Sequence, residues 1–210
     1  KVINEYGKII VLEDDLVISP YFLRFMNEAL GFYRDEPQVM HISGYIFPIN
    51  TKGLPDTFFL KPTSCWGWAT WDRAWKYFEK NLQKLVKTFT KEEIKDFNLG
   101  GTEDNWSQVI ANLKGKINTW GIFWYASVYK QGGLSLHPKI SYTQNIGHDD
   151  TGTHCRRTDV FKTSLVQGMC KFEKDIKLNV EAEKRLAEYF RSIKPSFLRR
   201  VVNKIRRILV

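Results

Sequence analysis

The sequence contains few cysteines and histidines and no long apolar run. Its three cysteines, Cys65, Cys155 and Cys170, make an odd number without a C-x-x-C pair. This pattern argues against a disulfide framework or a cysteine metal cluster and fits a reducing compartment. No apolar segment approaches the roughly 20 residues that span a bilayer, and the start lacks a signal-peptide pattern. We therefore expect a cytoplasmic location.

A basic surface is also lacking once the end of the chain is set aside. The net charge is +9, but after Glu188 there are seven Lys or Arg residues and no acid. Without those seven, 25 basic residues face 23 acidic ones. The sequence therefore predicts no nucleic-acid partner. With 210 residues, 43% of them hydrophobic, the chain is long enough for one sizeable core. We expect a folded body at 1–190 and a tail at 191–210.

The most informative stretch is 8–20, where an apolar run leads into three consecutive acids, Glu13, Asp14 and Asp15. The run at 9–12 has no polar alternation, which is typical of a strand covered on both faces in a largely parallel sheet. Acids at the carboxyl end of such a strand lie where open α/β sheets bind ligands. Adjacent carboxylates repel one another, and a divalent cation such as Mg²⁺ or Mn²⁺ is the simplest compensation. A solvated acidic turn is the alternative.

Periodicity and turn residues predict alternating helices and strands along the rest of the body. His41, in the middle of a predicted strand, is expected to be a core residue. One predicted helix starts at Ser19-Pro20, and three others lie at 82–97, 104–113 and 180–190. A capping box at 90–93 falls within the second of these regions. The predicted strands lie at 38–45, 58–60, 119–129 and 134–136.

The segment 64–78 holds four of the seven tryptophans. Trp68, Trp71 and Trp75 recur at helical spacing, which predicts an aromatic helix face in the core. Trp66 and Trp68 also flank Gly67, where an aromatic ring can offer a flat apolar face to a sugar. Both interpretations stay open for these two residues.

Two polar segments complete the candidate sites. In the first, at 102–106, Asp104 stands where it can cap the following helix, and acids are favoured at helix starts. The second, at 145–154, is rich in Gly, Asp and Thr and contains His148 and His154. It is either a metal-binding loop or an ordinary surface loop.

Taken in order, these motifs resemble those of GT-A-fold glycosyltransferases that use nucleotide sugars. The likeness is greatest to bacterial sugar transferases that act on surface polysaccharide, and more distant to the Golgi N-acetylglucosaminyltransferase that opens complex N-glycan synthesis. Glu13 stands where Asp is commoner in the family. The matching elements are E-D-D at 13–15 followed by Ser-Pro-aromatic, Gly-Trp at 67–68, E-D-x-W at 103–106, N-I-G-H-D at 145–149 and G-T-H at 152–154.

The resemblance implies an α/β fold with a GT-A-like, mixed and largely parallel sheet flanked by helices. It also implies metal-dependent, inverting transfer of a sugar from a nucleotide-sugar donor to a saccharide or lipid-linked saccharide in surface polysaccharide synthesis. The residues it marks are Asp104 as catalytic base; Asp15, Asp14, His148 and His154 for Mn²⁺ or Mg²⁺; Glu13, Asp14, Gly44 and Trp68 near the donor; and Trp66, Glu103 and Trp106 near the acceptor.

A GT-A fold needs earlier strands to hold the nucleotide, so we expect this chain to lack them and to bind nucleotide weakly alone. The rival hypothesis is a non-catalytic carbohydrate- or partner-binding domain derived from this fold. A two-metal phosphoesterase is a weaker third, because too few His and Asp residues cluster.

The end of the chain has its own pattern. Residues 196–210 place apolar residues on one helical face and basic residues opposite, which is typical of peripheral contact with an anionic membrane. Such contact would hold the protein at the inner face of the membrane. Packing against another part of the protein is the alternative.

Overall fold

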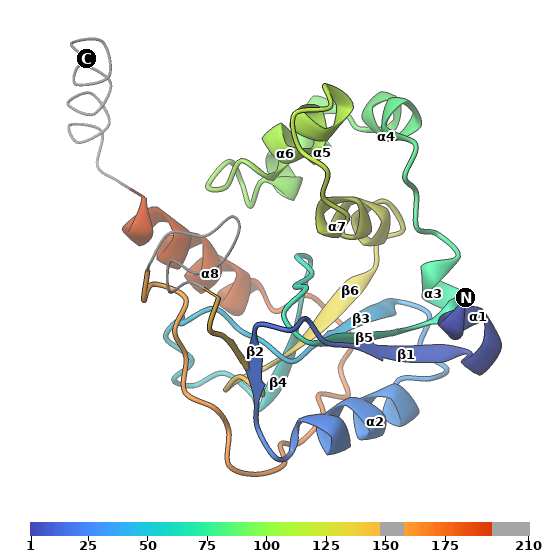
Figure 1. Ribbon diagram of the computed structural model, residues 1–210. Coiled ribbons are helices and arrows are strands. Elements are labelled where there is room, and N and C mark those ends of the chain that lie inside the picture. The colour runs from blue at the N-terminus through green and yellow to red at the C-terminus, as the bar shows by residue number, and fades with distance from the viewer. Residues whose placement is uncertain (148–157, 195–210) are drawn as a thin grey trace.

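The protein is a mixed α/β structure in which helices cover a five-stranded mixed sheet (Figure 1). The structure, a computed structural model, describes residues 1–147 and 158–194. The sheet has the order β1-β5-β3-β6-β4, and a separate two-stranded ladder pairs β2 with β7. The strands are β1 Lys8–Val11, β2 Leu16–Ile18, β3 Val39–Ser43, β4 Thr57–Leu60, β5 Trp68–Trp71, β6 Leu134–Pro138 and β7 Thr143–Asn145.

The helices divide between the faces and the rim of this sheet (Figure 1). The apolar side of α2 packs on one face through Phe22, Phe25 and Met26. On the opposite face, Trp124 and Val128 of α7 pack over Met40 and Trp68. The helix α8 lies along β4. The helices are α1 Val2–Tyr6, α2 Phe22–Phe32, α3 Asp72–Trp75, α4 Leu82–Thr88, α5 Lys91–Phe97, α6 Asn105–Leu113, α7 Gly121–Lys130 and α8 Val180–Ile193.

Helices α4 to α7 share a second apolar core, which includes Phe97, Val109 and Phe123. This helical group stands beside the sheet (Figure 1).

The α/β class is confirmed, whereas the largely parallel sheet is not. Of the four strand pairs in the sheet, only β3 with β6 is parallel. The prediction failed because continuous apolar runs report burial on both faces and not strand direction. Here, helices on both faces bury antiparallel strands as thoroughly as parallel ones.

The run at 9–12 was also predicted to be covered on both faces. Residues 9–11 lie on the edge strand β1 and are only half buried, and Leu12 lies beyond the strand and is exposed. The run pairs with β5 alone within the described part of the chain, so one of its edges stays unpaired.

Two aromatic segments exchange their predicted secondary structures. Trp68 and Trp71 lie on strand β5 and not on a helix. Both are buried, which was expected of Trp71 and was one of the two interpretations left open for Trp68. The segment at 121–130 forms helix α7 and not a strand, and seven consecutive residues of it are buried. A helix that is buried all round has no polar face, so its periodicity cannot be distinguished from that of a buried strand.

The remaining predicted elements are present with shifted ends. The capping box at Thr90 forms, with Thr90 Oγ1 accepting from Glu93 N and Glu93 Oε2 accepting from Thr90 N. His41 is fully buried in β3. Helix α8 extends to Ile193, past the expected boundary at 190, and residues 195–210 lie outside the described residues.

Candidate functional site

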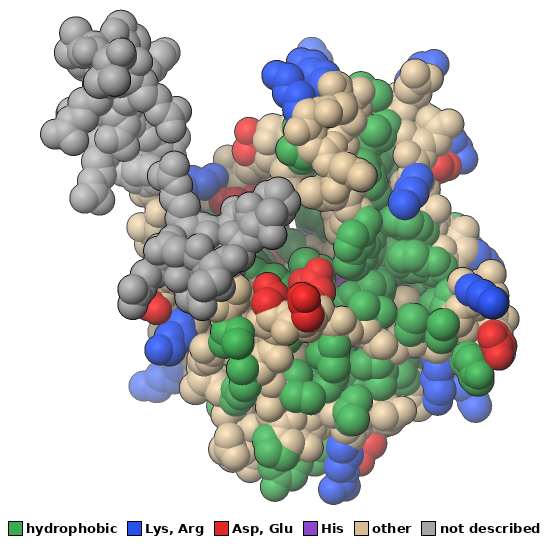
Figure 2. Space-filling view, in the orientation of Figure 1, with side chains coloured by type: hydrophobic (Ala, Val, Ile, Leu, Met, Phe, Trp, Pro, Cys, Tyr) green, Lys and Arg blue, Asp and Glu red, His purple; other side chains and the backbone are tan. Residues whose placement is uncertain are grey.

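The acidic turn at 13–15 is joined to the segment 145–147 by the small β2–β7 ladder. Leu16 pairs with Asn145 in this ladder, and Ile146 N donates to Asp15 O at 2.9 Å. Two motifs that are 130 residues apart in the sequence therefore meet at one place. Figure 2 shows acidic side chains gathered over the β1–β2 turn, beside a hollow and surrounded by hydrophobic groups.

Asp15 is the most constrained of the three acids. Its Oδ2 accepts a hydrogen bond from Asn145 Nδ2 at 2.8 Å, and Asn145 Oδ1 in turn accepts from Gly147 N at 2.8 Å. A Cβ atom added to Gly147 would lie 2.6 Å from Asp15 Oδ2, so only glycine fits there. The other oxygen, Asp15 Oδ1, is buried and has no hydrogen-bond partner among the described residues.

Glu13 faces the same region from a half-buried position. Burial raises the pKa of Glu13, and the charges of Asp15 and Asp14 raise it further. The Cys65 thiol hydrogen-bonds to the Glu13 carboxylate, and burial together with Glu13 raises the pKa of this thiol to about 12. Cys65 is therefore a neutral hydrogen-bond partner and not a thiolate ligand.

These residues fit a hard divalent cation. A buried carboxylate oxygen without a partner costs free energy unless a ligand satisfies it, and oxygen donors suit Mg²⁺ and Mn²⁺. Asp15 would supply that oxygen, and the exposed Asp14 stands next to it. No group of three His, Cys, Asp or Glu side chains with metal-binding geometry occurs within 1–147 and 158–194. The predicted ligands His148 and His154 lie outside those ranges.

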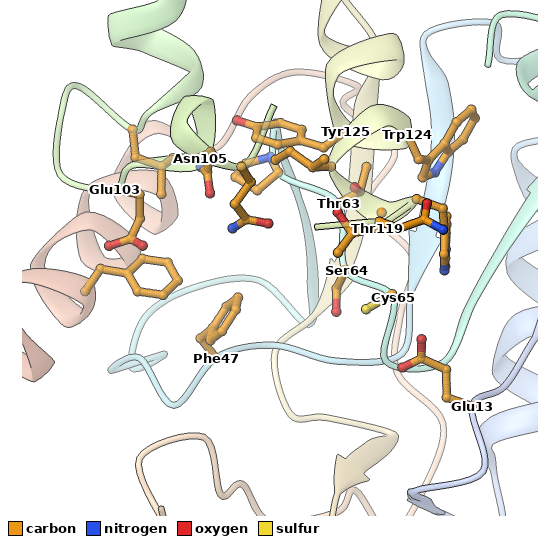
Figure 3. A pocket seen from close by; sticks show the side chains of 18 residues that line it. Glu13, Phe47, Thr63, Ser64, Cys65, Glu103, Asn105, Thr119, Trp124 and Tyr125 are labelled. Atoms are coloured by element: carbon orange, nitrogen blue, oxygen red, sulfur yellow. The ribbon is translucent and has the colours of Figure 1, made fainter. Parts of the chain in front are cut away.

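A pocket of 460 Å³ extends from Glu13 to Glu103 (Figure 3). The loop between β4 and β5 forms its floor with Thr63, Ser64 and Cys65. Residues 118–121, before and at the start of α7, form one wall, and Phe47 and Phe190 contribute rings on another. The two glutamates lie at opposite sides of the pocket (Figure 3).

The turn at 103–104 presents its two acids differently. Glu103 lines the pocket and is half buried, and Lys194 Nζ lies 2.9 Å from its Oε1. Asp104 is exposed, is not among the residues that line the pocket, and occupies the N-cap position of α6 without a side-chain capping bond. Asn98 Oδ1 accepts from Trp106 N at 2.9 Å instead. The carboxylate of Asp104 is therefore not engaged in holding the helix.

The glycines of the site explain how its segments approach one another. Gly44 N donates to Gly67 O at 2.7 Å, and a Cβ atom at Gly44 would lie 2.9 Å from that oxygen. Gly67 has a φ of 71°, and a Cβ atom there would lie 2.5 Å from Thr143 Cγ2. Thr143 Oγ1 donates to Trp66 O at 2.7 Å. Gly44 and Gly67 therefore allow strand ends from three segments to pack closely.

The tryptophans expected at the site lie mainly within aromatic clusters. Trp68 is 3% exposed and stacks between His41 and Trp120. Trp66 is half buried, with its ring 4.6 Å from that of Tyr45. Trp106 packs in the helical core, 4.8 Å from Phe89. None of these three tryptophans lines the described pocket.

Several residues that shape the site were not predicted from the sequence. Cys65 hydrogen-bonds to the Glu13 carboxylate. Asn98 Oδ1 accepts the Trp106 N–H near the start of α6. Phe47 and Phe190 come from a loop and from α8. A capping pattern could have indicated Asn98, since Asn is favoured at helix ends. No local pattern marks Phe47 or Phe190, because only the fold brings them together.

Comparisons with protein-family models and with curated proteins found no match to this chain.

Proposed function

We propose that the protein is a metal-dependent, inverting glycosyltransferase of GT-A type, which transfers a sugar from a nucleotide-sugar donor to a saccharide or lipid-linked saccharide. One observation carries this proposal. Glu13 and Glu103 line opposite sides of one pocket. Glu13 belongs to the acidic turn that is hydrogen-bonded to the segment 145–147, and Glu103 directly precedes Asp104 at the start of α6.

The hydrogen bonding and burial of Asp15 support a donor-binding role for the acidic turn at 13–15. One of its oxygens is held by Asn145, and the other is buried without a partner in the described structure. Bound there, Mn²⁺ or Mg²⁺ would offset the negative charge of the diphosphate leaving group. Asn145 and Gly147 fix the direction of the Asp15 carboxylate, so this ligand is oriented before the donor arrives.

The position of Asp104 supports an acceptor-binding role for the turn at 103–104. Its carboxylate is exposed at the start of α6, and no capping bond restrains it. In the proposed reaction Asp104 takes the proton from the attacking hydroxyl as that oxygen bonds to the anomeric carbon. Glu103, which lines the pocket, accepts a hydrogen bond from another acceptor hydroxyl.

Calorimetry with MnCl₂ and each common nucleoside diphosphate tests the donor site, using the protein with any residues that precede Lys1 in its gene product. Asp15→Ala is expected to abolish most metal-dependent nucleotide binding. Asp35→Ala is the matched control, because Asp35 is an exposed acid that pairs with the neighbouring Arg34. Unchanged binding in Asp15→Ala would remove Asp15 from the site.

A non-catalytic carbohydrate-binding domain is the second candidate. It is favoured by the pocket itself, whose aromatic and polar lining needs no nucleotide to form. Glycoside binding without any metal-dependent nucleotide binding would support this candidate over the transferase.

Membrane attachment remains a proposal about residues 196–210, which lie outside the described structure. Within the described residues, no helix has both the length and the apolar character needed to cross a bilayer. Each basic residue near an anionic surface contributes about 1 kcal/mol. We expect salt-sensitive co-sedimentation with anionic vesicles, lost in a protein that ends at Lys194; equal binding by both proteins would exclude the anchor.

A further inference from the structure

The described polar residues that line the pocket between Glu13 and Glu103 are either acidic or neutral. Its two charged lining residues are both acids, and no Lys or Arg is among the described residues that line it. The neutral polar groups are amides and hydroxyls, namely Thr63, Ser64, Asn105, Gln108, Asn118 and Thr119. Such a set can exchange hydrogen bonds with a ligand that carries many hydroxyls, because amides and hydroxyls both donate and accept.

Among the described residues, the cation that pairs with Glu103 is already engaged. Lys194 Nζ lies 2.9 Å from Glu103 Oε1 and also donates to the backbone oxygen of Thr102. Glu103 Oε1 is nevertheless buried and accepts no well-directed hydrogen bond from the described residues. It therefore retains capacity for a donor from a ligand. At the far end, the Cys65 thiol is a hydrogen-bond partner of the Glu13 carboxylate, and no described Lys or Arg forms an ion pair with Glu13.

Carboxylates accept hydrogen bonds and cannot donate them. A hydroxyl or an ammonium group of a ligand satisfies such oxygens, whereas a ligand carboxylate or phosphate adds a like charge. Two unit charges about 6 Å apart in a partly solvated site repel by enough to weaken binding at least about tenfold.

The apolar part of the lining suits a ring that also has an apolar side. Phe47 and Phe190 pack edge to face with centroids 4.8 Å apart, and both line the pocket. Trp120 lines it as well, with one of its faces stacked on Trp68. Pyranose rings carry C–H groups on one face that pack on aromatic rings, and their hydroxyls point to the sides.

We propose that this pocket binds an uncharged or amino-bearing pyranose of the acceptor and discriminates against sugars that carry carboxylate, sulfate or phosphate. This inference rests on the proposed function only in assigning the pocket to the acceptor. The proposal names an acceptor class that the sequence motifs do not define. It attributes the discrimination against anionic sugars to Glu103.

Equilibrium binding of free glycosides tests the proposal without requiring turnover. The probes are methyl β-D-glucopyranoside and methyl β-D-glucopyranosiduronate, which differ only at C6, with binding followed by ligand-observed NMR. We expect the uncharged glycoside to bind at least about tenfold more tightly than the uronate. This comparison uses the unmodified protein, so it does not depend on the folding of any variant.

The substitution Glu103→Gln keeps the shape of the side chain, removes its charge and leaves Lys194 unpaired. We expect the preference for the uncharged glycoside to fall to about one or to reverse. Glu92→Gln is the matched control, because Glu92 is an exposed acid in the first turn of α5 and does not line the pocket. It should leave the preference unchanged.

Equal or tighter binding of the uronate, or no binding of either glycoside, would overturn the proposal. A preference that persists in Glu103→Gln would move the discrimination away from Glu103 and overturn its assigned role. If metal-dependent nucleotide binding fails while the glycoside preference holds, the transferase is excluded and the pocket inference stands.

Discussion

The two acidic turns beside the pocket use asparagine in opposite ways. At the first turn, Asn145 Nδ2 donates to Asp15 and holds its carboxylate in place. At the second, Asn98 Oδ1 accepts the Trp106 N–H, and this leaves Asp104 at an N-cap position without a capping bond. A fixed, buried oxygen suits a cation that needs preset ligands, whereas an exposed and unrestrained carboxylate can reach a substrate proton.

The neighbouring helix start shows what an engaged N-cap looks like. Thr90 caps α5 with a complete capping box, in which both partners donate and accept. Asp104 stands at the equivalent position of α6 in the same helical group, but its side chain makes no capping hydrogen bond. The contrast indicates that the structure does not need the Asp104 side chain, which leaves it available for chemistry.

The largest expected effect concerns the reaction. Asp104→Asn keeps the shape of the side chain but cannot accept a proton, so we expect the transfer rate to fall by about 100-fold or more. Donor affinity and melting temperature should stay near those of the unmodified protein. Single-turnover kinetics with the nucleotide-sugar donor measures the rate. An unchanged rate with a lowered melting temperature would instead identify Asp104 as a structural cap.

The next effect concerns the fixed turn. Gly147→Ala places a Cβ atom 2.6 Å from Asp15 Oδ2 and forces the Asn145–Asp15 hydrogen bond apart. We expect the free energy of unfolding to fall by about 1–3 kcal/mol, and metal-dependent nucleotide binding to weaken. Urea unfolding and calorimetry measure the two effects.

Gly168→Ala provides the control for that experiment, because a Cβ atom there meets nothing within 4 Å. Its stability should be close to that of the unmodified protein. Equal losses in both variants would mean that the close approach to Asp15 is not responsible.

The buried residue His41 differs from the acids of the two turns, because its role is structural. Trp124 Nε1 donates to His41 Nδ1 at 3.0 Å, so this nitrogen must be unprotonated. Burial, followed by the neighbouring His137, holds the pKa of His41 well below its usual value of 6.5. Below pH 6.5 the unfolded chain therefore binds the proton more tightly than the folded protein does.

It follows that stability contributed by neutral His41 is fully present above pH 6.5 and is lost as the pH falls below it, by up to about 1.4 kcal/mol per pH unit. Urea unfolding at several pH values measures this slope. His41→Gln keeps an acceptor for Trp124 and removes the titration, so its slope should be shallower. An identical slope in the variant would assign the effect to other groups.

The comparison of turns also shows where sequence reasoning works. The acids at 13–15 and the helix start at 104 are local features, and both lie at the predicted positions. Strand direction is not a local feature. β5 runs antiparallel to both of its neighbours, β1 and β3, and the direction of a strand depends on the path of the chain between strands. An apolar run in the sequence carries no information about that path. The same limit applies to α7, in which burial of every residue from 122 to 128 removes the periodicity.

The site was predictable only in part for the same reason. Asp15 and Asn145 were each marked by a motif, but their hydrogen bond depends on the β2–β7 register. Trp68 was predicted near the donor because of the Gly-Trp motif, and it lies buried among other aromatic rings. A tryptophan-rich segment indicates a large buried surface first, and a sugar site only where the fold leaves a ring exposed.

The smallest expected effect bears directly on the two helix starts. Thr90→Ala removes the capping oxygen of α5 and is expected to lower the free energy of unfolding by about 1 kcal/mol. Asp104→Ala removes no capping bond, so its effect on stability should be within about 0.5 kcal/mol of zero. Urea unfolding of both variants at pH 7 measures the difference. Because the two helices share one apolar core, any loosening of that core affects both variants alike. A loss in Asp104→Ala as large as that in Thr90→Ala would show that the carboxylate supports α6, and the argument for Asp104 as a free proton acceptor would then fail.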